Sequence, residues 1–304
     1  MAKPIRIAGL LRRMPIARAS SKVLRAVLLD LLDKVPEARS GASKKGIHDL
    51  RVAVKRFREA FRLFRPVLRK KTFRKHREWI EDLNDALGEV RDRDVALARL
   101  RKLATGLAEP PLSVAGLMAR LESERTGAVD ALAAMLDRLQ LEGAPAQLAA
   151  RIESIGQEAA SGRLTHEFAR ERVRERLLDV RARWAAARRE ATPESLHRAR
   201  IGNKRLRYAI EPFSRMLGKE VRRLYRSASR FHDVLGDLHD ADSMTVMLET
   251  SMSGSPKAER RAWERLSVKV MRARRVALRK AFSLADQLEP LWDDAQRSVE
   301  EPPH

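Results

Sequence analysis

Two stretches of this chain place histidine, lysine and arginine at the spacing of one helix face, and the chemistry they offer is the binding of anions. Side chains three or four residues apart are neighbours on a helix surface. Forked guanidinium groups and imidazole N–H donors suit phosphate oxygens. The first row is His48, Arg51, Lys55, Arg58, Arg62, Arg65 and Arg69, and the second is His197, Arg200, Lys204 and Arg207.

Most of the net charge lies in these two stretches. The 304 residues carry 63 Lys and Arg against 41 Asp and Glu, a formal charge of +22. Residues 44–75 hold 13 cations and two acids, a net +11, and residues 197–230 hold 11 and two, a net +9. The other 238 residues therefore sum to +2. Charge that only kept the protein soluble would be spread over the surface, so the concentration predicts a site for a polyanion.

The two stretches are copies of one another. Residues 48–58 align with residues 197–207 at an offset of 149, and residues 85–94 align with residues 233–242 at an offset of 148. Two blocks in the same order at nearly equal spacing indicate an internal duplication. The sequence therefore predicts a basic N-terminal tail over 1–15 and one domain over 16–295, made of halves 16–142 and 146–295.

The secondary structure is predicted to be helical almost throughout, because Ala, Leu, Arg and Glu dominate and Pro and Gly cluster at breaks. We expect Pro66 to shorten its helix, Thr192 and Pro193 to begin one, and Gly202–Asn203 to loosen the second basic helix. The fold class predicted is all-α: two four-helix bundles related by pseudo-twofold symmetry, with a basic central cleft or pore. The helices are expected at 17–35, 44–69, 71–105, 111–140, 164–190, 194–217, 219–250 and 256–288, with a short connecting helix at 146–160.

The motif H-x-x-R-[VI]-x-x-[KR]-R-[FL]-R, followed by L-G-x-[VL]-x-D, resembles the CHAD family, the conserved histidine α-helical domain. Both copies are present, over His48–Arg58 with Leu87–Asp92 and over His197–Arg207 with Leu235–Asp240. The resemblance implies paired helical bundles whose basic cleft binds inorganic polyphosphate, with association with polyphosphate granules. Together with the basic row and the second motif, it nominates His48, Arg51, Lys55, Arg56, Arg58, Arg62, Arg91, His197, Arg200, Lys204, Arg205, Arg207 and His239 as polyphosphate-binding residues.

Acidic stripes leave a catalytic alternative open. A divalent metal held by them would allow phosphohydrolysis of polyphosphate or nucleotides, whereas the alternative role is to pair with and orient basic side chains. Positive surroundings disfavour a cation, and the motifs HExxH and GxxxxGK[ST] are missing from the sequence. We therefore predict no catalysis, no metal and no cofactor. The stripes are Asp85, Glu89 and Asp92 in the first half and Asp233, Asp237 and Asp240 in the second.

Composition narrows the remaining classes. The chain has no cysteine, so disulfides and thiol chemistry are excluded. No apolar run reaches membrane-spanning length, and no signal peptide is predicted. We expect a cytoplasmic protein without a membrane partner. RNA or DNA binding is the second alternative, disfavoured because aromatic residues make up only 5% of the chain and form no stacking row.

Overall fold

The computed structural model describes residues 5, 7–41, 43–68, 70–105, 112–157 and 163–300. Across these ranges the protein is all-α, with nine α-helices, two short 3₁₀ helices and no strand. No helix in this part of the chain is long and apolar enough to cross a membrane. The helices are α1 (Ile16–Arg39), α2 (Lys44–Leu63), α3 (Lys70–Ala104), α4 (Leu112–Leu141), α5 (Ala144–Gln157), α6 (Thr165–Glu190), α7 (Pro193–Ile210), η1 (Glu211–Phe213), α8 (Lys219–Ser253), η2 (Lys257–Glu259) and α9 (Arg260–Glu300).

Helix ends follow the local sequence. The Ser43 hydroxyl accepts a hydrogen bond of 3.0 Å from the Gly46 N–H and so caps α2. Thr192 caps α7 and Pro193 occupies its first turn, as predicted. The two basic helices end earlier than predicted, α2 at Leu63 before Pro66 and α7 at Ile210 before Pro212. A proline has no N–H for the helical hydrogen bond. After α7 the chain continues as the 3₁₀ helix η1, with Glu211 still in the helical conformation.

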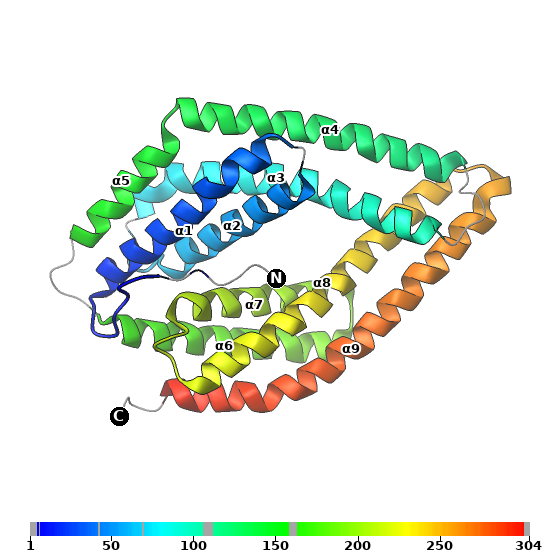
Figure 1. The fold of residues 1–304 in the computed structure, drawn as a ribbon. Helices are drawn as coiled ribbons and strands as arrows, with labels where there is room; N and C mark the ends of the chain where they lie inside the picture. The colour runs from blue at the N-terminus through cyan, green and yellow to red at the C-terminus, as the bar shows by residue number, and fades with distance from the viewer. Residues whose placement is uncertain are drawn as a thin grey trace.

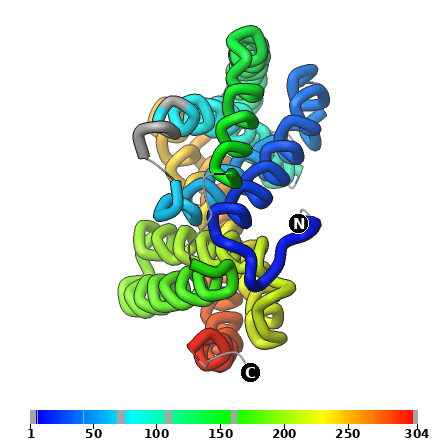
Figure 2. Tube along the Cα trace, turned by 90° about the vertical axis from the view of Figure 1, so that its left-hand side faces the viewer, coloured from blue at the N-terminus to red at the C-terminus, as the bar shows by residue number. Residues whose placement is uncertain are grey.

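The helices form two groups that lie against each other (Figure 1). In the first group α1, α2, α3 and α4 pack in chain order, with α5 against α1. In the second group α6, α7, α8 and α9 pack in chain order, and α9 returns to α6. The groups meet where α2 contacts α7 and where α3 contacts α9. The view from the side shows the same two layers (Figure 2).

Both hydrophobic cores cross from one group to the other. The main core includes Phe64, which stacks on Phe168 of α6 at 5.6 Å between ring centroids and meets Phe213 of η1 edge-on at 6.0 Å. The second core lies at the far ends of the long helices, where side chains such as Leu97 and Leu117 join Trp263. The halves therefore share apolar burial at two places along their length, which fixes how α2 lies against α7.

The N-terminal segment also connects the groups. The Met14 carbonyl accepts hydrogen bonds from both the N–H and the hydroxyl of Thr165, at 2.9 and 2.7 Å. The Ile5 N–H donates to the Glu211 carboxylate at 3.3 Å. Residues 1–4 and 6 of the predicted tail, and Arg69 of the first basic row, lie outside the described residues.

Candidate functional site

The contact between α2 and α7 brings the centres of the two basic rows together. Burial, together with the nearby charges of Arg51, Arg200 and Lys204, lowers the pKa of Lys55 to about 7. Burial also lowers the pKa values of Arg51 and Arg200, and the charge of Arg51 lowers the pKa of Arg200 further. Four cations from two helices thus lie within electrostatic reach of one another. We call Arg51, Lys55, Arg200 and Lys204 the central cluster.

Each arginine of the central cluster rests on a glycine of the second motif. A Cβ placed on Gly88 of α3 would lie 4.0 Å from Arg51 Nη2, and one on Gly236 of α8 would lie 4.0 Å from Arg200 Nε. The repeated glycines thus mark the surface on which each guanidinium lies. Both Nε atoms are buried and have no hydrogen-bond partner within the described residues. A buried donor without a partner costs free energy, so an anion placed here would gain two charged donors.

Histidines and Arg91 flank the central cluster in matching positions. Burial and then the charge of Arg91 lower the pKa of His48 between α2 and α3. In the second half His197 of α7 contacts His239 of α8, with ring centroids 4.8 Å apart. Burial also lowers the pKa values of His197 and His239. These imidazoles are therefore neutral near pH 7, where a nearby anion would favour their charged forms.

Two residues near the cluster did not enter the predicted site. Glu59 is only 6% exposed and pairs with Lys204 at 3.3 Å and Arg62 at 2.7 Å. Burial acts in the opposite direction, but Lys204 and Arg62 hold the pKa of Glu59 below its usual value. Burial lowers the pKa of His232 on α8 well below the ordinary value, with Arg200 contributing. Glu59 lies one helical turn after Lys55, so its place beside the first basic row could have been predicted from the sequence. His232 belongs to no motif that would single it out.

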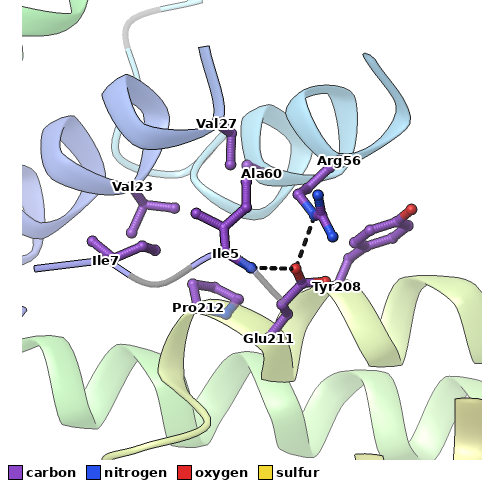
Figure 3. Close-up of a pocket in the computed structure, with 9 residues that line it drawn as sticks. All are labelled: Ile5, Ile7, Val23, Val27, Arg56, Ala60, Tyr208, Glu211 and Pro212. Atoms are coloured by element: carbon purple, nitrogen blue, oxygen red, sulfur yellow. Dashed lines mark hydrogen bonds and ion pairs between the residues drawn. The ribbon is translucent and has the colours of Figure 1, made fainter. Parts of the chain in front are cut away.

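The structure places Arg56 away from the central cluster. Its side chain is 9% exposed and pairs with Asp30 of α1 at 3.2 Å and Glu211 of η1 at 2.8 Å. Arg56 and Glu211 line a small pocket beneath the N-terminal segment, together with Ile5 and Tyr208 (Figure 3). Arg56 follows Lys55 by one residue, so helical geometry turns it about 100° away from the row. Its position ties the two halves together by an ion pair.

Of the other predicted binding arginines, some lie near the central cluster and one makes a structural contact instead. Arg58 and Arg62 lie close enough for their charges to lower the pKa of Lys204, although burial has the larger effect. The pKa of Arg205 is lowered by burial and by Arg62. Arg207 instead points to α8, donating to the Ser229 hydroxyl at 2.9 Å with its guanidinium over the Tyr225 ring. Arg207 thus helps to hold α7 on α8.

Gly202 and Asn203 do not loosen α7, contrary to the sequence prediction. The helix runs unbroken from Pro193 to Ile210. A Cβ on Gly202 would lie 2.7 Å from Arg183 Cδ and 3.4 Å from Val180 Cα, so the glycine permits close approach of α6. The buried Asn203 side chain donates to the Ala228 carbonyl of α8 at 2.8 Å. Both residues therefore fix α7 in place.

Several acids of the predicted stripes pair with arginine. Asp92 contacts Arg51 at 3.3 Å and Glu89 contacts Arg93 at 2.5 Å. Asp240 contacts Arg99 of α3 at 2.8 Å, an ion pair that crosses between the halves. Among the described residues, no group of three or more His, Asp and Glu side chains is placed to hold a metal ion.

This geometry defines a class of all-α protein in which two equivalent basic helices lie in contact. The family model described as CHAD domain matches residues 22–249, and the chain therefore belongs to the CHAD domain family, which confirms the resemblance seen in the motifs.

Two solved structures are similar. One is the CHAD domain from the plant Ricinus communis, with TM-score 0.69 and 21% identity, covering 100% of this chain and 98% of that chain. The other is PptA from Streptomyces chartreusis, with TM-score 0.63 and 16% identity, covering 90% of this chain and 100% of that chain. At these identities both share the fold. No curated protein matches the chain significantly.

Proposed function

We propose that this protein binds inorganic polyphosphate without catalysis, in a basic cleft between two four-helix bundles related by an internal duplication and pseudo-twofold symmetry. The observation that carries the proposal is the central cluster, where Arg51 and Lys55 of α2 meet Arg200 and Lys204 of α7. Four basic groups held together at the meeting of two helices repel one another, and burial together with this repulsion lowers the pKa of Lys55 to about 7. A chain of phosphates would offset the repulsion.

Pairs of matched residues support the pseudo-twofold relation. Phe64 and Phe213 occupy equivalent positions of the two copies and touch each other. Arg51 and Arg200, also equivalent, each lie on the glycine of the adjacent second motif. A linear polyanion has similar ends, so a nearly symmetric row of donors suits it. The proposed binding residues are His48, Arg51, Lys55, Arg58, Arg62, Arg91, His197, Arg200, Lys204, Arg205 and His239.

Binding rather than hydrolysis is favoured by the acids. Asp92 and Asp240 each pair with an arginine, which suits a role in orienting basic side chains. Assays for phosphate release from polyphosphate or nucleotides with Mg²⁺, Mn²⁺ or Ca²⁺ test this point. Metal-dependent turnover would replace the binding proposal by that of a phosphohydrolase.

Titration with long-chain polyphosphate and with single-stranded RNA at equal salt tests the ligand. We expect polyphosphate to bind more tightly. Affinity should fall on the order of 10³-fold between about 50 and about 200 mM salt if six or more phosphates are contacted. Tighter binding of RNA, with affinities that differ among homopolymers, would favour the nucleic-acid alternative. Location in the cytoplasm, on polyphosphate granules, is part of the proposal, and colocalisation with granules tests it.

The double variant Arg51→Ala/Arg200→Ala tests the site. Polyphosphate affinity should drop by about two orders of magnitude or more, since hydrogen bonds to charged groups contribute about 1.5–3 kcal/mol each. Helicity and melting temperature should change little, because neither side chain belongs to a hydrophobic core and each removal relieves repulsion between cations. The matched control is Arg77→Ala/Arg174→Ala, two exposed arginines on α3 and α6. Equal losses in the two variants would reject the site.

A further inference from the structure

The longest helix, α9, separates its charges along its length. Residues 260–280 contain nine Lys and Arg and one acid, Glu264, a net +8. Residues 281–300 contain five acids and one cation, Arg297, a net −4. The near-neutral sum outside the two basic windows conceals this third concentration of positive charge. The two parts of α9 are therefore expected to have different roles.

The acidic part of α9 is used within the fold. Arg188 of α6 pairs with Asp286 at 2.5 Å and with Glu289 at 2.8 Å. Arg181 of α6 pairs with Asp293 at 2.6 Å. These ion pairs fasten the end of α9 to α6, so the acids there have partners that explain them.

The basic part has no such explanation. Its apolar side chains, including Trp263, Leu266 and Val270, are buried against the core. Its cations face the opposite way, and Figure 1 shows α9 along the outer edge of the molecule. We define the α9 stripe as the exposed residues Arg261, Arg265, Lys269, Arg272, Arg275, Arg279 and Lys280.

The α9 stripe lacks acidic partners in the described part of the chain. None of its members forms an ion pair with an acid in the described part of the chain, although Lys269 donates to the Leu103 carbonyl at 3.1 Å. Arg274, on the flank of the same helix, does pair with Asp242. At a rise of 1.5 Å per residue the stripe extends about 28 Å, with a cation roughly every 4–5 Å. Such a row repels itself unless an anion runs along it.

We propose that the α9 stripe is a second binding track for a linear phosphate polymer. Five guanidinium and two ammonium groups along one helix face match repeated phosphates along one thread. The one aromatic residue of 260–280, Trp263, is buried, so the stripe offers no platform for stacking bases. Membrane-surface helices present large aromatic and aliphatic side chains such as Trp, Phe and Leu to the lipid. The exposed large apolar residues beside these cations are Val268, Met271 and Val276, without Trp, Phe or Leu among them.

The inference rests on the proposed function only for the class of ligand, a linear phosphate polymer. None of the residues of the α9 stripe belongs to the central cluster. One polymer long enough to reach both places would be held twice, which raises its overall affinity by effective concentration. The inference therefore predicts that long-chain polyphosphate uses both regions of the surface.

The test is a charge reversal of the stripe, Arg265→Glu/Arg272→Glu/Arg279→Glu. Its control is Arg77→Glu/Arg120→Glu/Arg174→Glu, three exposed arginines on α3, α4 and α6 that change the net charge equally. Circular dichroism establishes that both fold. We expect the stripe variant to bind long-chain polyphosphate roughly tenfold more weakly than the control, with a slope of log affinity against log salt smaller by about two to three. Equal affinity and slope in the two variants would overturn the inference.

A second arm separates this inference from the proposed central site. In the Arg51→Ala/Arg200→Ala background, residual polyphosphate binding should remain and should disappear when the stripe is also reversed. If the stripe variant loses affinity but Arg51→Ala/Arg200→Ala does not, the α9 track stands and the central site fails. Stripe-dependent binding to duplex DNA or to anionic phospholipid vesicles that is tighter than to polyphosphate would overturn the track.

Discussion

The basic helices α2 and α7 come from one duplicated sequence, yet they agree only in part. Both keep an arginine and a lysine four residues apart in the central cluster. Beyond it, α2 has Glu59 where α7 has Tyr208, and the position of Arg62 is taken by Glu211. Each acid pairs with the other half: Glu59 with Lys204 at 3.3 Å and Glu211 with Arg56 at 2.8 Å. The equal positions of the central cluster suit a shared ligand, and the two acids that diverged join the halves.

The most direct test of the equivalence of α2 and α7 is to remove the two equivalent arginines one at a time. Arg51→Ala and Arg200→Ala should each weaken polyphosphate binding by about 10- to 100-fold, because each removes a charged donor worth about 1.5–3 kcal/mol. Isothermal titration calorimetry at fixed salt measures both. Losses that differ by more than about tenfold would show that the central cluster is not used symmetrically.

Much of the fold was predictable because its determinants are local. Helical spacing of apolar residues, prolines at breaks and the Thr192 cap gave helices that the structure contains. The internal duplication predicted that the two basic rows share a role, because equivalent motifs of a duplicated sequence are expected at equivalent positions of the fold. Shared apolar cores that cross the halves depend on contacts far apart in sequence, and no periodicity reveals those.

The next prediction concerns Lys55, whose pKa of about 7 arises from burial, from Arg51 on its own helix and from Arg200 and Lys204 opposite. A bound polyanion favours the protonated amine, so binding takes up a proton. Affinity should therefore fall as the pH rises through about 7, by roughly tenfold from about pH 7 to about pH 8.5. The neighbouring histidines, with lowered pKa values, are also neutral over this range before the anion binds. A variant of Lys55 that keeps its charge therefore has to separate proton uptake by Lys55 from uptake by these histidines.

Lys55→Arg supplies the control, since a guanidinium stays charged throughout. Its affinity should vary much less over the same pH interval, as measured by titration in matched buffers. An unchanged pH dependence in Lys55→Arg would assign the titration to another group.

A smaller effect is expected at Glu59, which α7 replaces by Tyr208. Glu59→Gln removes the anion that pairs with Lys204 and Arg62, so polyphosphate should bind several-fold more tightly. The free protein should lose about 1–3 kcal/mol of unfolding free energy, since buried cations lose a partner. Because the pKa of Glu59 is lowered below 4.5, the wild type keeps this stabilisation above that pH and loses it as the pH falls through the lowered value.

Thermal melting with and without polyphosphate measures both parts of this prediction. The stability gap between Glu59→Gln and the wild type should narrow in acid and also when polyphosphate is present. A variant that is less stable and also binds more weakly would mean that Glu59 holds the cations in place for the ligand.

The parts of the site that sequence could not give depend on side-chain direction. Arg56 and Lys55 are adjacent in the same motif, yet one pairs with Asp30 and Glu211 while the other joins the central cluster. The motif lists both without separating them. From sequence alone, Gly202 is expected to destabilise its helix. In the structure, however, the backbone of α6 at Val180 lies against this glycine. The physical meaning of both residues comes from a neighbouring helix.

The smallest effects are expected at Asp92 and its equivalent Asp240, where the second motifs keep the same acid but pair it with different arginines. Asp92 is 74% exposed and pairs with Arg51 within its own half, so Asp92→Asn should leave the melting temperature nearly unchanged. It should tighten polyphosphate binding by less than about fivefold, because a screened surface pair contributes about 0–1 kcal/mol. Asp240 pairs with Arg99 across the halves and is 33% exposed, so Asp240→Asn should lower the melting temperature by more. Equal melting temperatures in the two variants would mean that the cross-half ion pair adds nothing to the way the shared cores already hold α3 against α8.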